Sequence, residues 1–565
     1  HRQKGSAPWA LRGALESLTD LSRPLTVALR SQWLHSFVRT FRSGVTDRPL
    51  VTRLGFLLDS DSCIGCHACT VACKSEHDVP LGVNRTWVKY IESGSFPDVS
   101  RHFSVMRCNQ CDDAPCMTIC PTSALYRADN GVVDFQDDDC IGCKACMNAC
   151  PYDAIYLNPE TNTAHKCNFC NHRIEDGLEP SCVIVCPTQA IRVGDLDDPD
   201  SEISRLHADG GLVRSPEQNT RPKVIYTGAT ASSLDPLASA ISDDGLIWAD
   251  TTPGHSTPTP VALTAAPTRD DGEPMARTAY TTQHPPVWGS LVSGYLVTKA
   301  IAAGVTLVAS LLVVLGHGDE RSVIGVVPPL VAGVFLVLTG VLLVADLKQP
   351  KRFWYLLTRG NSTSWLVKGA WVLGAFAVCL AAWWVVGLTD AGGALPVIVV
   401  PTVLLALGTA GYTAFLFGQC EGRDLWQESL LLPVLLAQAV MAGGASWSLL
   451  DQFLDVPSHE SVKWLFLVGL VANAALVGAE VRGGHSRHVT MALADLRLGA
   501  QKKRWRKWLF CTVFAMLFLS LDILLGNFVF DWTGPVQPIV PLAALYGLFA
   551  YEDAYVRAGQ SVPLS

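Results

Sequence analysis

Four groups of cysteines are the residues of this chain whose types and spacing could do chemistry. Sixteen of the nineteen cysteines belong to them, namely Cys63, Cys66, Cys69 and Cys73; Cys108, Cys111, Cys116 and Cys120; Cys140, Cys143, Cys146 and Cys150; and Cys167, Cys170, Cys182 and Cys186. The first and third groups both have the spacing C-x2-C-x2-C-x3-C. Three thiolates on such a short loop can each bind one iron of a cubane, while the fourth thiolate points toward a different cluster. The spacing therefore predicts 4Fe–4S clusters held by thiolates.

Structural zinc and disulfide bonds are the alternative uses of these cysteines, because C-x2-C pairs also occur in zinc ribbons. A zinc site needs two C-x2-C pairs for each ion and has no use for four closely spaced cysteines followed by proline, as at Cys150 and Pro151. Disulfides between cysteines three residues apart would also be hard to form. Iron ligation accounts for all sixteen cysteines.

Around these cysteines the chain resembles the four-cluster ferredoxin-like subunits of molybdopterin oxidoreductases, such as those of dimethyl sulfoxide reductase, polysulfide reductase and formate dehydrogenase. The resemblance covers roughly residues 52 to 228 and rests on CIGCHACTVACKSEHDVP, RCNQCDDAPCMTICPTSAL, CIGCKACMNACPYDAI, KCNFCNHRI and SCVIVCPTQAI. It implies an α+β ferredoxin-like domain with four 4Fe–4S clusters. The implied ligand sets are Cys63, Cys66 and Cys69 with Cys186; Cys167, Cys170 and Cys182 with Cys73; Cys108, Cys111 and Cys116 with Cys150; and Cys140, Cys143 and Cys146 with Cys120.

A row of four such clusters can serve as an electron wire, because none of them offers an open iron to a substrate. The resemblance therefore implies a separate catalytic subunit of the molybdopterin type. We expect no catalytic residue in this chain, and we expect substrate catalysis to take place on that partner.

The second half of the chain is rich in Leu, Val, Ala and Gly, and it holds eight long apolar stretches. They are 290–316, 323–345, 366–388, 395–418, 428–450, 462–480, 507–530 and 536–553. About 20 apolar residues are needed to cross roughly 30 Å of hydrocarbon. Buried helices of a soluble protein cannot explain eight such stretches in succession. The sequence therefore predicts an all-α polytopic bundle of about eight transmembrane helices in the cytoplasmic membrane.

This half is similar to the NrfD-like membrane subunits of polysulfide reductases over roughly residues 288 to 555. The similarity rests on WGSLVSGYLVTKAIAAG, DLKQPKRFWYLLTRGNSTSWLVKGAW and GYTAFLFGQCEGRDLWQESLLLP. It implies a bundle that binds quinone, either menaquinone or ubiquinone, without haem. No histidine lies inside a predicted span, where a haem ligand would have to be. The resemblance assigns Tyr412 to the quinone pocket, and a membrane-interface anchor is the alternative.

Several other polar residues in or beside the apolar stretches are candidates for quinone or proton chemistry. Tyr295 and Lys299 lie four residues apart and so share a helix face. A lysine in an apolar helix is costly unless it is used, paired or extended to the surface. Asp346 could relay a quinol proton, or it could form a cap or a salt bridge. Glu480 and Asp522 are candidates for a proton route because acids inside a membrane are rarely without a use.

Charge suggests the orientation of the chain and excludes one class of partner. The connections after the second, fourth and sixth stretches are basic, whereas Arg321 and Lys463 stand almost alone on the opposite side. The positive-inside rule therefore predicts a cytoplasmic cluster domain. The formal net charge of -8 gives no basic excess for binding nucleic acid.

The predicted domain order has five parts. They are a basic segment 1–50, which is either amphipathic helices or a poorly ordered leader; the cluster domain 51–228; a linker 229–287 rich in Pro, Thr and Ser; the membrane domain 288–555; and a tail 556–565.

Together these patterns predict the electron-transfer and membrane-anchor subunit of a respiratory oxidoreductase complex, which passes electrons between a catalytic subunit and quinone. Three alternatives remain open: the same wire serving a hydrogenase, a redox-driven ion-translocating module, and a membrane scaffold whose clusters are structural.

Overall fold

The computed structural model describes residues 53–95, 97–241, 247–248, 276–282, 284–317, 321–389, 395–525 and 538–565. The expected N-terminal segment 1–50 and much of the expected linker lie outside these residues. Thr52–Ser565 forms one compact unit. Along the chain, this unit consists of a mixed α/β region that carries the sixteen grouped cysteines, followed by a helical region.

A three-stranded sheet holds the mixed region together. Its central strand β1 (Leu54–Asp59) runs antiparallel to β8 (Ile191–Asp195) and parallel to β9 (Val224–Thr227). Four successive residues of β1, of sequence GFLL, are buried. A strand that is covered on both faces reads as a continuous apolar run, as this one does.

The pairing of β1 with β8 brings the first and last cysteine groups together. Leu58 pairs with Ile191 in the antiparallel register. Cys63 follows Leu58 by five residues, and Cys186 precedes Ile191 by five residues. Because paired strands lie only about 5 Å apart, the two loops that leave this end of the sheet meet.

A second sheet has the order β10–β12–β2–β3, with β11 also paired to β12. Its strands are β2 (Thr86–Ser95), β3 (Asp98–Arg107), β10 (Ser239–Ile241), β11 (Ile247–Trp248) and β12 (Ala276–Thr281). The segment expected as a linker therefore contributes three short strands to the cluster region, and residues 249–275 of that segment lie outside the described part of the chain.

Short helices and two hairpins complete the cluster region. The hairpins pair β4 (Leu125–Arg127) with β5 (Val133–Phe135), and β6 (Ile155–Leu157) with β7 (Ala164–Lys166). The helices are α4 (Ala68–Glu76), α5 (Pro115–Ile119), α6 (Ala145–Ala149), α7 (Asn171–Glu175), α8 (Ser181–Ile184), α9 (Glu202–Ala208) and α10 (Ala231–Leu234). This α and β content agrees with the predicted fold class.

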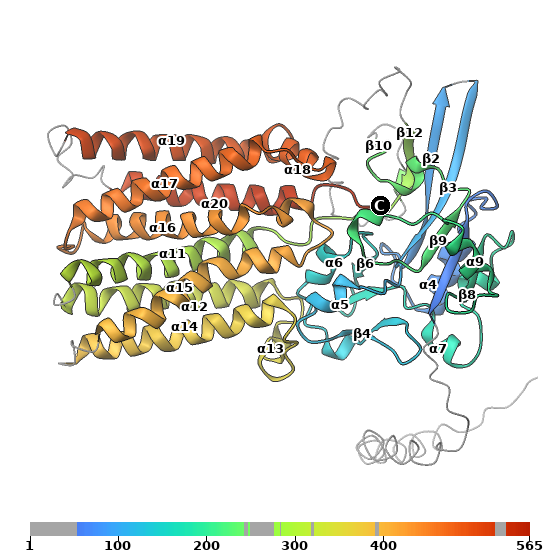
Figure 1. Ribbon diagram of the computed structural model, residues 1–565, viewed down its shortest axis with the longest axis horizontal. Coiled ribbons are helices and arrows are strands. Elements are labelled where there is room, and N and C mark those ends of the chain that lie inside the picture. Colours follow the sequence, from blue (N-terminus) through green and yellow to red (C-terminus); the bar gives the residue numbers. More distant parts are fainter. Residues whose placement is uncertain are drawn as a thin grey trace, which may run out of the picture. The chain divides into compact units, whose positions relative to one another are not determined.

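The helical region is a bundle, drawn from yellow-green to red in Figure 1. Seven helices among the described residues are long and apolar enough to cross a membrane. They are α11 (Ser290–Leu312), α12 (Val327–Asp346), α14 (Trp365–Leu388), α15 (Leu395–Gly418), α16 (Leu431–Leu450), α17 (His459–Arg482) and α19 (Lys502–Leu525). The short helices α13 (Tyr355–Thr358) and α18 (Arg487–Arg497) lie between them.

The eighth predicted span is also a helix, α20 (Ile539–Gly559), but it is not one of the seven. Its last turns carry Glu552, Asp553 and Arg557, which make it less apolar than the others. All three side chains are buried or half-buried. The helix packs against α11, α16 and α19. It therefore brings charge into the interior of the bundle.

Burial separates central helices from peripheral ones. In the most apolar window of each helix, 72% of the residues are buried in α16 and 61% in α11, against 28% in α12 and 17% in α14. The exposed side chains on α12 and α14 include Val337, Val341 and Val378. A large exposed apolar surface on a long helix is what contact with lipid tails requires.

The two central helices cross backbone to backbone at Gly304 of α11 and Gly443 of α16. A Cβ atom on Gly304 would lie 2.0 Å from the carbonyl oxygen of Ala439 and 2.6 Å from the nitrogen of Gly443. Small residues at such a crossing allow the close packing that holds membrane helices together.

Replacing Gly304 with alanine is expected to lower the free energy of unfolding of the bundle by about 1–3 kcal/mol, because the added methyl group overpacks the crossing. Thermal unfolding of the detergent-solubilised protein measures this loss. Gly333→Ala in α12 is the matched control, since no atom lies within 4 Å of a Cβ at that position. Equal stability of the two variants would contradict the prediction.

Candidate functional site

Three cavities in the cluster region are each lined by four of the grouped cysteines. Their volumes, including the part that is open to solvent, are similar, at about 380, 330 and 310 Å³. In the same order, their cysteines are Cys120, Cys140, Cys143 and Cys146; Cys108, Cys111, Cys116 and Cys150; and Cys63, Cys66, Cys69 and Cys186. Each foursome coincides with one of the ligand sets that the family resemblance implies. Three sites of equal ligand number and similar size suit three copies of the same group.

The fourth implied set also comes together. The Cys73 thiol lies within electrostatic range of Cys167, Cys170 and Cys182. The assignment of all sixteen cysteines as iron ligands stays a prediction. The structure groups these cysteines into the four sets of four that four clusters would require.

The two loops with the spacing C-x2-C-x2-C-x3-C have the same backbone conformation. Gly65 and His67 in the first loop have φ angles of 69° and 59°, and Gly142 and Lys144 in the third have φ angles of 67° and 65°. These left-handed residues alternate with the cysteines and wind each loop tightly. Glycine fits the first position in both loops because it adopts a positive φ without strain.

The chemistry of the donors fits iron–sulfur clusters. Burial raises the pKa of Cys69 to about 11 and that of Cys143 to about 12. A metal ion supplies the positive charge that deprotonates such a buried thiol. Among the described residues, no three His, Cys, Asp or Glu side chains converge closely enough to hold a single metal ion. A cubane takes one thiolate at each of its four corners.

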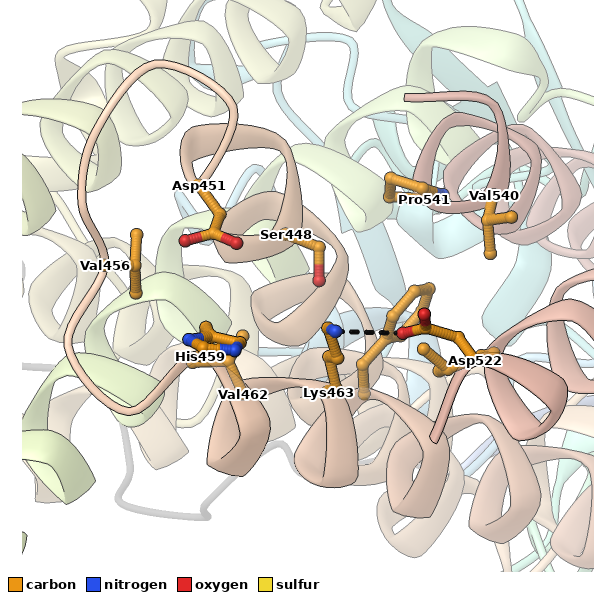
Figure 2. Close-up of a pocket in the computed structure, with 11 residues that line it drawn as sticks. Ser448, Asp451, Val456, His459, Val462, Lys463, Asp522, Val540 and Pro541 are labelled. Atoms are coloured by element: carbon orange, nitrogen blue, oxygen red, sulfur yellow. Dashed lines mark ion pairs between the residues drawn. The ribbon is translucent and has the colours of Figure 1, made fainter. Parts of the chain in front are cut away.

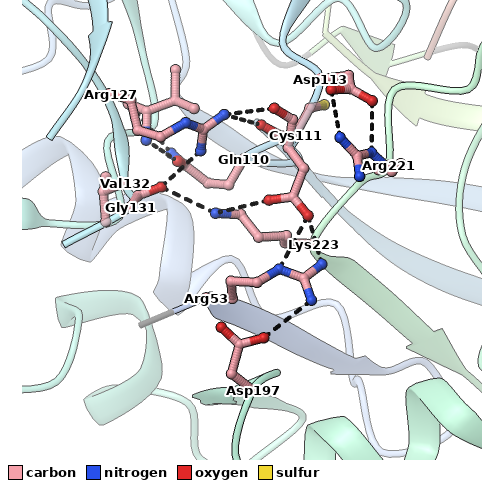
Figure 3. Close-up of polar contacts among 12 residues, drawn as sticks. Arg53, Gln110, Cys111, Asp113, Arg127, Gly131, Val132, Asp197, Arg221 and Lys223 are labelled. Carbon is pink, nitrogen blue, oxygen red and sulfur yellow. Dashed lines mark hydrogen bonds and ion pairs between the residues drawn. The ribbon is translucent and has the colours of Figure 1, made fainter. Parts of the chain in front are cut away.

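A polar network fixes the loop that carries the second cysteine group (Figure 3). Arg127 donates from Nη2 to the carbonyl oxygens of Cys111, at 3.0 Å, and Asp112, at 2.7 Å. The Asp112 carboxylate forms ion pairs with Arg53, at 2.5 Å, and Lys223, at 3.8 Å. These contacts hold the loop rigidly beside its cavity.

Two buried cations beside the cysteines were not among the predicted residues. Arg107 donates from Nη1 to the Cys182 sulfur at 3.3 Å, and Lys166 donates from Nζ to the Cys167 carbonyl at 3.1 Å. Both side chains are fully buried. Each directly precedes the first cysteine of a group in the sequence, and this adjacency is the signal that could have identified them.

The cavity lined by Cys120, Cys140, Cys143 and Cys146 lies against the membrane helices. Its loops accept hydrogen bonds from Trp288 Nε1 to the Cys143 carbonyl (3.0 Å), from Arg352 Nη1 to the Cys140 carbonyl (2.9 Å) and from Asn361 Nδ2 to the Cys120 carbonyl (3.0 Å). These donors come from the start of α11 and from the connection between α12 and α14. The membrane region therefore contacts this cavity directly.

Asp346, at the end of α12, pairs with the same loop. Its Oδ2 atom lies 2.9 Å from Nζ of Lys144, whose side chain is only 5% exposed. A salt bridge was one of the alternatives open for Asp346, and the structure contains it. Lys144 lines the cavity that contacts the helical region, and Asp346 is in electrostatic range of Tyr295.

Arg423 and Asp153 form a second buried ion pair between the two regions, with Nη2 and Oδ1 3.2 Å apart. Arg423 also donates to the Val562 carbonyl at 3.1 Å. An Arg423→Met variant is expected to lose about 3–5 kcal/mol of stability, because it leaves the Asp153 charge buried and unpaired. Thermal unfolding followed by cluster absorbance measures the loss. The exposed pair of Arg221 with Asp113 is the control, and Arg221→Met should change little.

Tyr295, Lys299 and Tyr412 come together inside the bundle. Lys299 donates from Nζ to the Ala410 carbonyl at 3.1 Å and to the Thr413 hydroxyl, and it lies 4.9 Å from the centre of the Tyr412 ring. Tyr295 is close enough to Tyr412 for their charges to interact. Lys299 is 1% and Tyr412 5% exposed, so neither reaches the surface of the bundle. The snorkelling and interface-anchor alternatives therefore do not describe them.

Glu480 lies at the cluster-facing end of α17, and it has a neighbour that was not predicted. The Tyr555 hydroxyl lies 3.3 Å from Oε1 of Glu480 and 2.9 Å from the Leu425 carbonyl. Glu552 of α20, in electrostatic range of both Glu480 and Lys299, is 3% exposed. The signal for Glu552 was a charge inside the last predicted apolar stretch.

Asp522 lies apart from these residues, in a cavity at the other end of α17 (Figure 2). Its Oδ2 atom pairs with Nζ of Lys463 at 2.9 Å, and Asp451, Ser448 and His459 line the same cavity. The structure therefore does not bring Asp522 together with Glu480 and Lys299. The ion-translocating alternative would be supported if Asp522, Glu480 and Lys299 lined one polar path, and their positions give no such support.

Comparisons with known proteins divide the chain in the same way. Residues 99–196 match the 4Fe-4S dicluster domain, and residues 279–529 match the family of polysulphide reductase NrfD. The thiosulfate reductase electron transfer subunit PhsB of Salmonella typhi is 42% identical over 180 residues, which are 31% of this chain and 93% of that protein. The arsenate respiratory reductase iron-sulfur subunit ArrB of a Shewanella species is 36% identical over 227 residues, covering 31% of this chain and 95% of that protein. Protein NrfC of Escherichia coli is 46% identical over 157 residues, 27% of this chain and 70% of that protein.

Proposed function

Because this chain belongs to the family of 4Fe-4S dicluster electron-transfer subunits, here joined to a polysulphide reductase NrfD membrane domain, we propose that it carries electrons between a catalytic partner and membrane quinone. The electrons pass along four 4Fe–4S clusters, which supply one-electron carriers held by the sixteen grouped cysteines. One observation carries the proposal: the cavity lined by Cys120, Cys140, Cys143 and Cys146 is in direct contact with the end of α12 and with the segments that lead into α11 and α14.

Contacts between the ligand sets support a linear order for this wire. Cys69 of the set that includes Cys186 is in electrostatic range of Cys182 in the set that includes Cys73. Gln110 of the second cysteine group donates to the Cys167 carbonyl at 2.9 Å. Cys116 is in turn in electrostatic range of Cys146 beside the membrane. The four sets therefore follow one another from Cys66, which is exposed, to the bundle.

The quinone site of this proposal is the cluster of Tyr295, Lys299 and Tyr412. A quinone headgroup needs hydrogen-bond donors at its carbonyls, and Lys299 and the two tyrosines are donors. Thr409, beside the Ala410 carbonyl that Lys299 contacts, has a buried hydroxyl without a partner among the described residues. An unpaired buried polar group calls for a ligand or water. Lys299 follows the start of α11 by nine residues, so it lies about 13 Å from the cluster-facing end of the helix.

The catalytic partner of this proposal is a molybdopterin-type reductase. Support comes from relatives whose names are those of reductase subunits, of thiosulfate reductase and arsenate respiratory reductase. The partner's electrons would enter or leave at the set that contains the exposed Cys66. A hydrogenase remains the alternative partner, since the same wire would serve it.

We also propose that the cluster region lies on the cytoplasmic side of the membrane. Support comes from basic residues at the cluster-facing ends of the helices, among them Arg482, Arg497, Lys502 and Lys503. Topology reporters fused after α15 and after α16 test this proposal. Cytoplasmic signal only from the first fusion supports it, and the reverse result overturns it.

The test of the proposed function is to purify the intact complex with its catalytic partner, assay its metals and follow cluster reduction by electron paramagnetic resonance after addition of a quinol analogue. We expect molybdenum or tungsten, about sixteen irons in this subunit, and reduction that a quinone-site inhibitor blocks. Nickel in place of molybdenum would favour the hydrogenase alternative. Clusters indifferent to quinol would overturn the proposal in favour of a scaffold.

A further inference from the structure

Two buried carboxylates lie between the cluster of Tyr295, Lys299 and Tyr412 and the surface of the bundle. Glu552 of α20 and Glu480 of α17 are each 3% exposed. Within the part of the chain that the structure describes, neither has an ion-pair partner at contact distance. A carboxylate buried without a partner in an apolar bundle is costly, and its presence indicates a use.

The inner end of this arrangement faces the proposed quinone site. Glu552 is in electrostatic range of Lys299 and lies beside Gln438 of α16. The buried Gln438 side chain interacts with the Glu552 carboxyl group. Glu552 therefore has polar neighbours on both α11 and α16.

The outer end reaches the loops at the cluster-facing ends of the helices. The Tyr555 hydroxyl lies 3.3 Å from Oε1 of Glu480 and 2.9 Å from the Leu425 carbonyl, so its one proton can be donated to either oxygen. Nε2 of His485 lies 2.5 Å from the main-chain carbonyl oxygen of Glu480, and His485 is in electrostatic range of the Glu480 carboxyl group. Nδ1 of His485 lies 3.2 Å from Oε1 of Glu428. The side chain of His485 is 8% exposed and that of Glu428 25% exposed. The exposed fraction therefore rises from Glu480 through His485 to Glu428, which is in contact with water.

We propose that Glu552, Glu480, Tyr555, His485 and Glu428 form a proton route between the quinone site and the surface on the cluster-region side. This inference rests on the proposed function. When quinol is oxidised to quinone, two O–H bonds break, two electrons pass to the nearest cluster one at a time, and two protons pass along these groups to water. Reduction of quinone uses the same groups in reverse.

The Asp522 cavity lies far from Glu480 along α17. Lys463, the partner of Asp522, precedes Glu480 on α17 by 17 residues, which is about 25 Å of helix. The buried residues of α17 between them are the apolar Phe466, Gly469, Leu470 and Val477 and the polar Asn473. Asp522 is therefore not included in the proposed route.

Single substitutions in the intact complex test the route. Glu552→Gln, Glu480→Gln and Tyr555→Phe are expected to slow cluster reduction by quinol about 100-fold, with an unchanged quinol concentration for half-maximal rate and unchanged iron content. The second readout is redox-difference infrared spectroscopy. Carboxyl carbonyl bands that change on reduction by dithionite should be missing from both glutamine variants. Glu460→Gln is the matched control, since Glu460 lies on α17 with its side chain 59% exposed.

The outcomes separate this route from the function on which it rests. A wild-type complex that ignores quinol would overturn both proposals. A wild-type complex that oxidises quinol, together with variants that keep its rate and its infrared bands, would overturn the route alone. If the glutamine variants fail to assemble, Tyr555→Phe still decides, because it removes one hydroxyl and no charge.

Discussion

A Cys143→Ala variant is expected to lose one cluster, with iron falling from about sixteen to about twelve atoms per chain, and to lose reduction of the remaining clusters by quinol. Cys143 lines the cavity that contacts the membrane helices, and its carbonyl accepts a hydrogen bond from Trp288 at the start of α11. Without that cluster the wire is interrupted at its membrane end. Iron analysis and electron paramagnetic resonance after addition of a quinol analogue measure both effects.

Dithionite, a soluble reductant, should still reduce the three remaining clusters of this variant, because it does not depend on the membrane. Cys379→Ala is the control, since Cys379 lies on α14 outside the four groups and should leave iron content and quinol reduction unchanged. Normal reduction of the Cys143→Ala protein by quinol would mean that electrons enter the wire at another cluster.

A Lys299→Met variant is expected to slow quinol-driven reduction by about 100-fold while every cluster is retained. Lys299 is the buried cation of the proposed quinone site, where it donates to the Ala410 carbonyl and lies over the Tyr412 ring. Methionine keeps most of the volume of lysine but cannot donate a hydrogen bond to a quinone oxygen or pass on its proton. Stopped-flow reduction by a quinol analogue measures the rate.

Lys368→Met controls for the loss of a lysine from a membrane helix. Lys368 lies over the Trp365 ring near the start of α14. Among the described residues it has no contact with the cluster of Tyr295, Lys299 and Tyr412. Its variant should keep the wild-type rate. A wild-type rate in Lys299→Met would mean that quinone does not bind at Lys299, but it would leave the proposed path of electrons through the clusters unaffected.

The basic residues used to predict orientation have a second use that only the structure reveals. Arg359 pairs with Asp139, Arg423 with Asp153, and Arg487 with Asp235, all across the contact between the two regions. A count of Lys and Arg in loops cannot separate charges that direct membrane insertion from charges that dock a domain. The orientation therefore rests on the basic residues outside these pairs.

The sequence by itself predicted which cysteines would hold the clusters and where the membrane helices run. Cluster ligands are predicted from spacing because, in the first and third groups, three of the four cysteines lie on one short loop, and spans are predicted from length because hydrocarbon demands an unbroken apolar helix. The neighbours across the fold were decided by tertiary structure alone. The loops of Cys120 and Cys143 contact the helical region, Glu552 lies in electrostatic range of Glu480, and Asp522 lies apart from both glutamates. These relations depend on which helices pack together, and no local spacing encodes that packing.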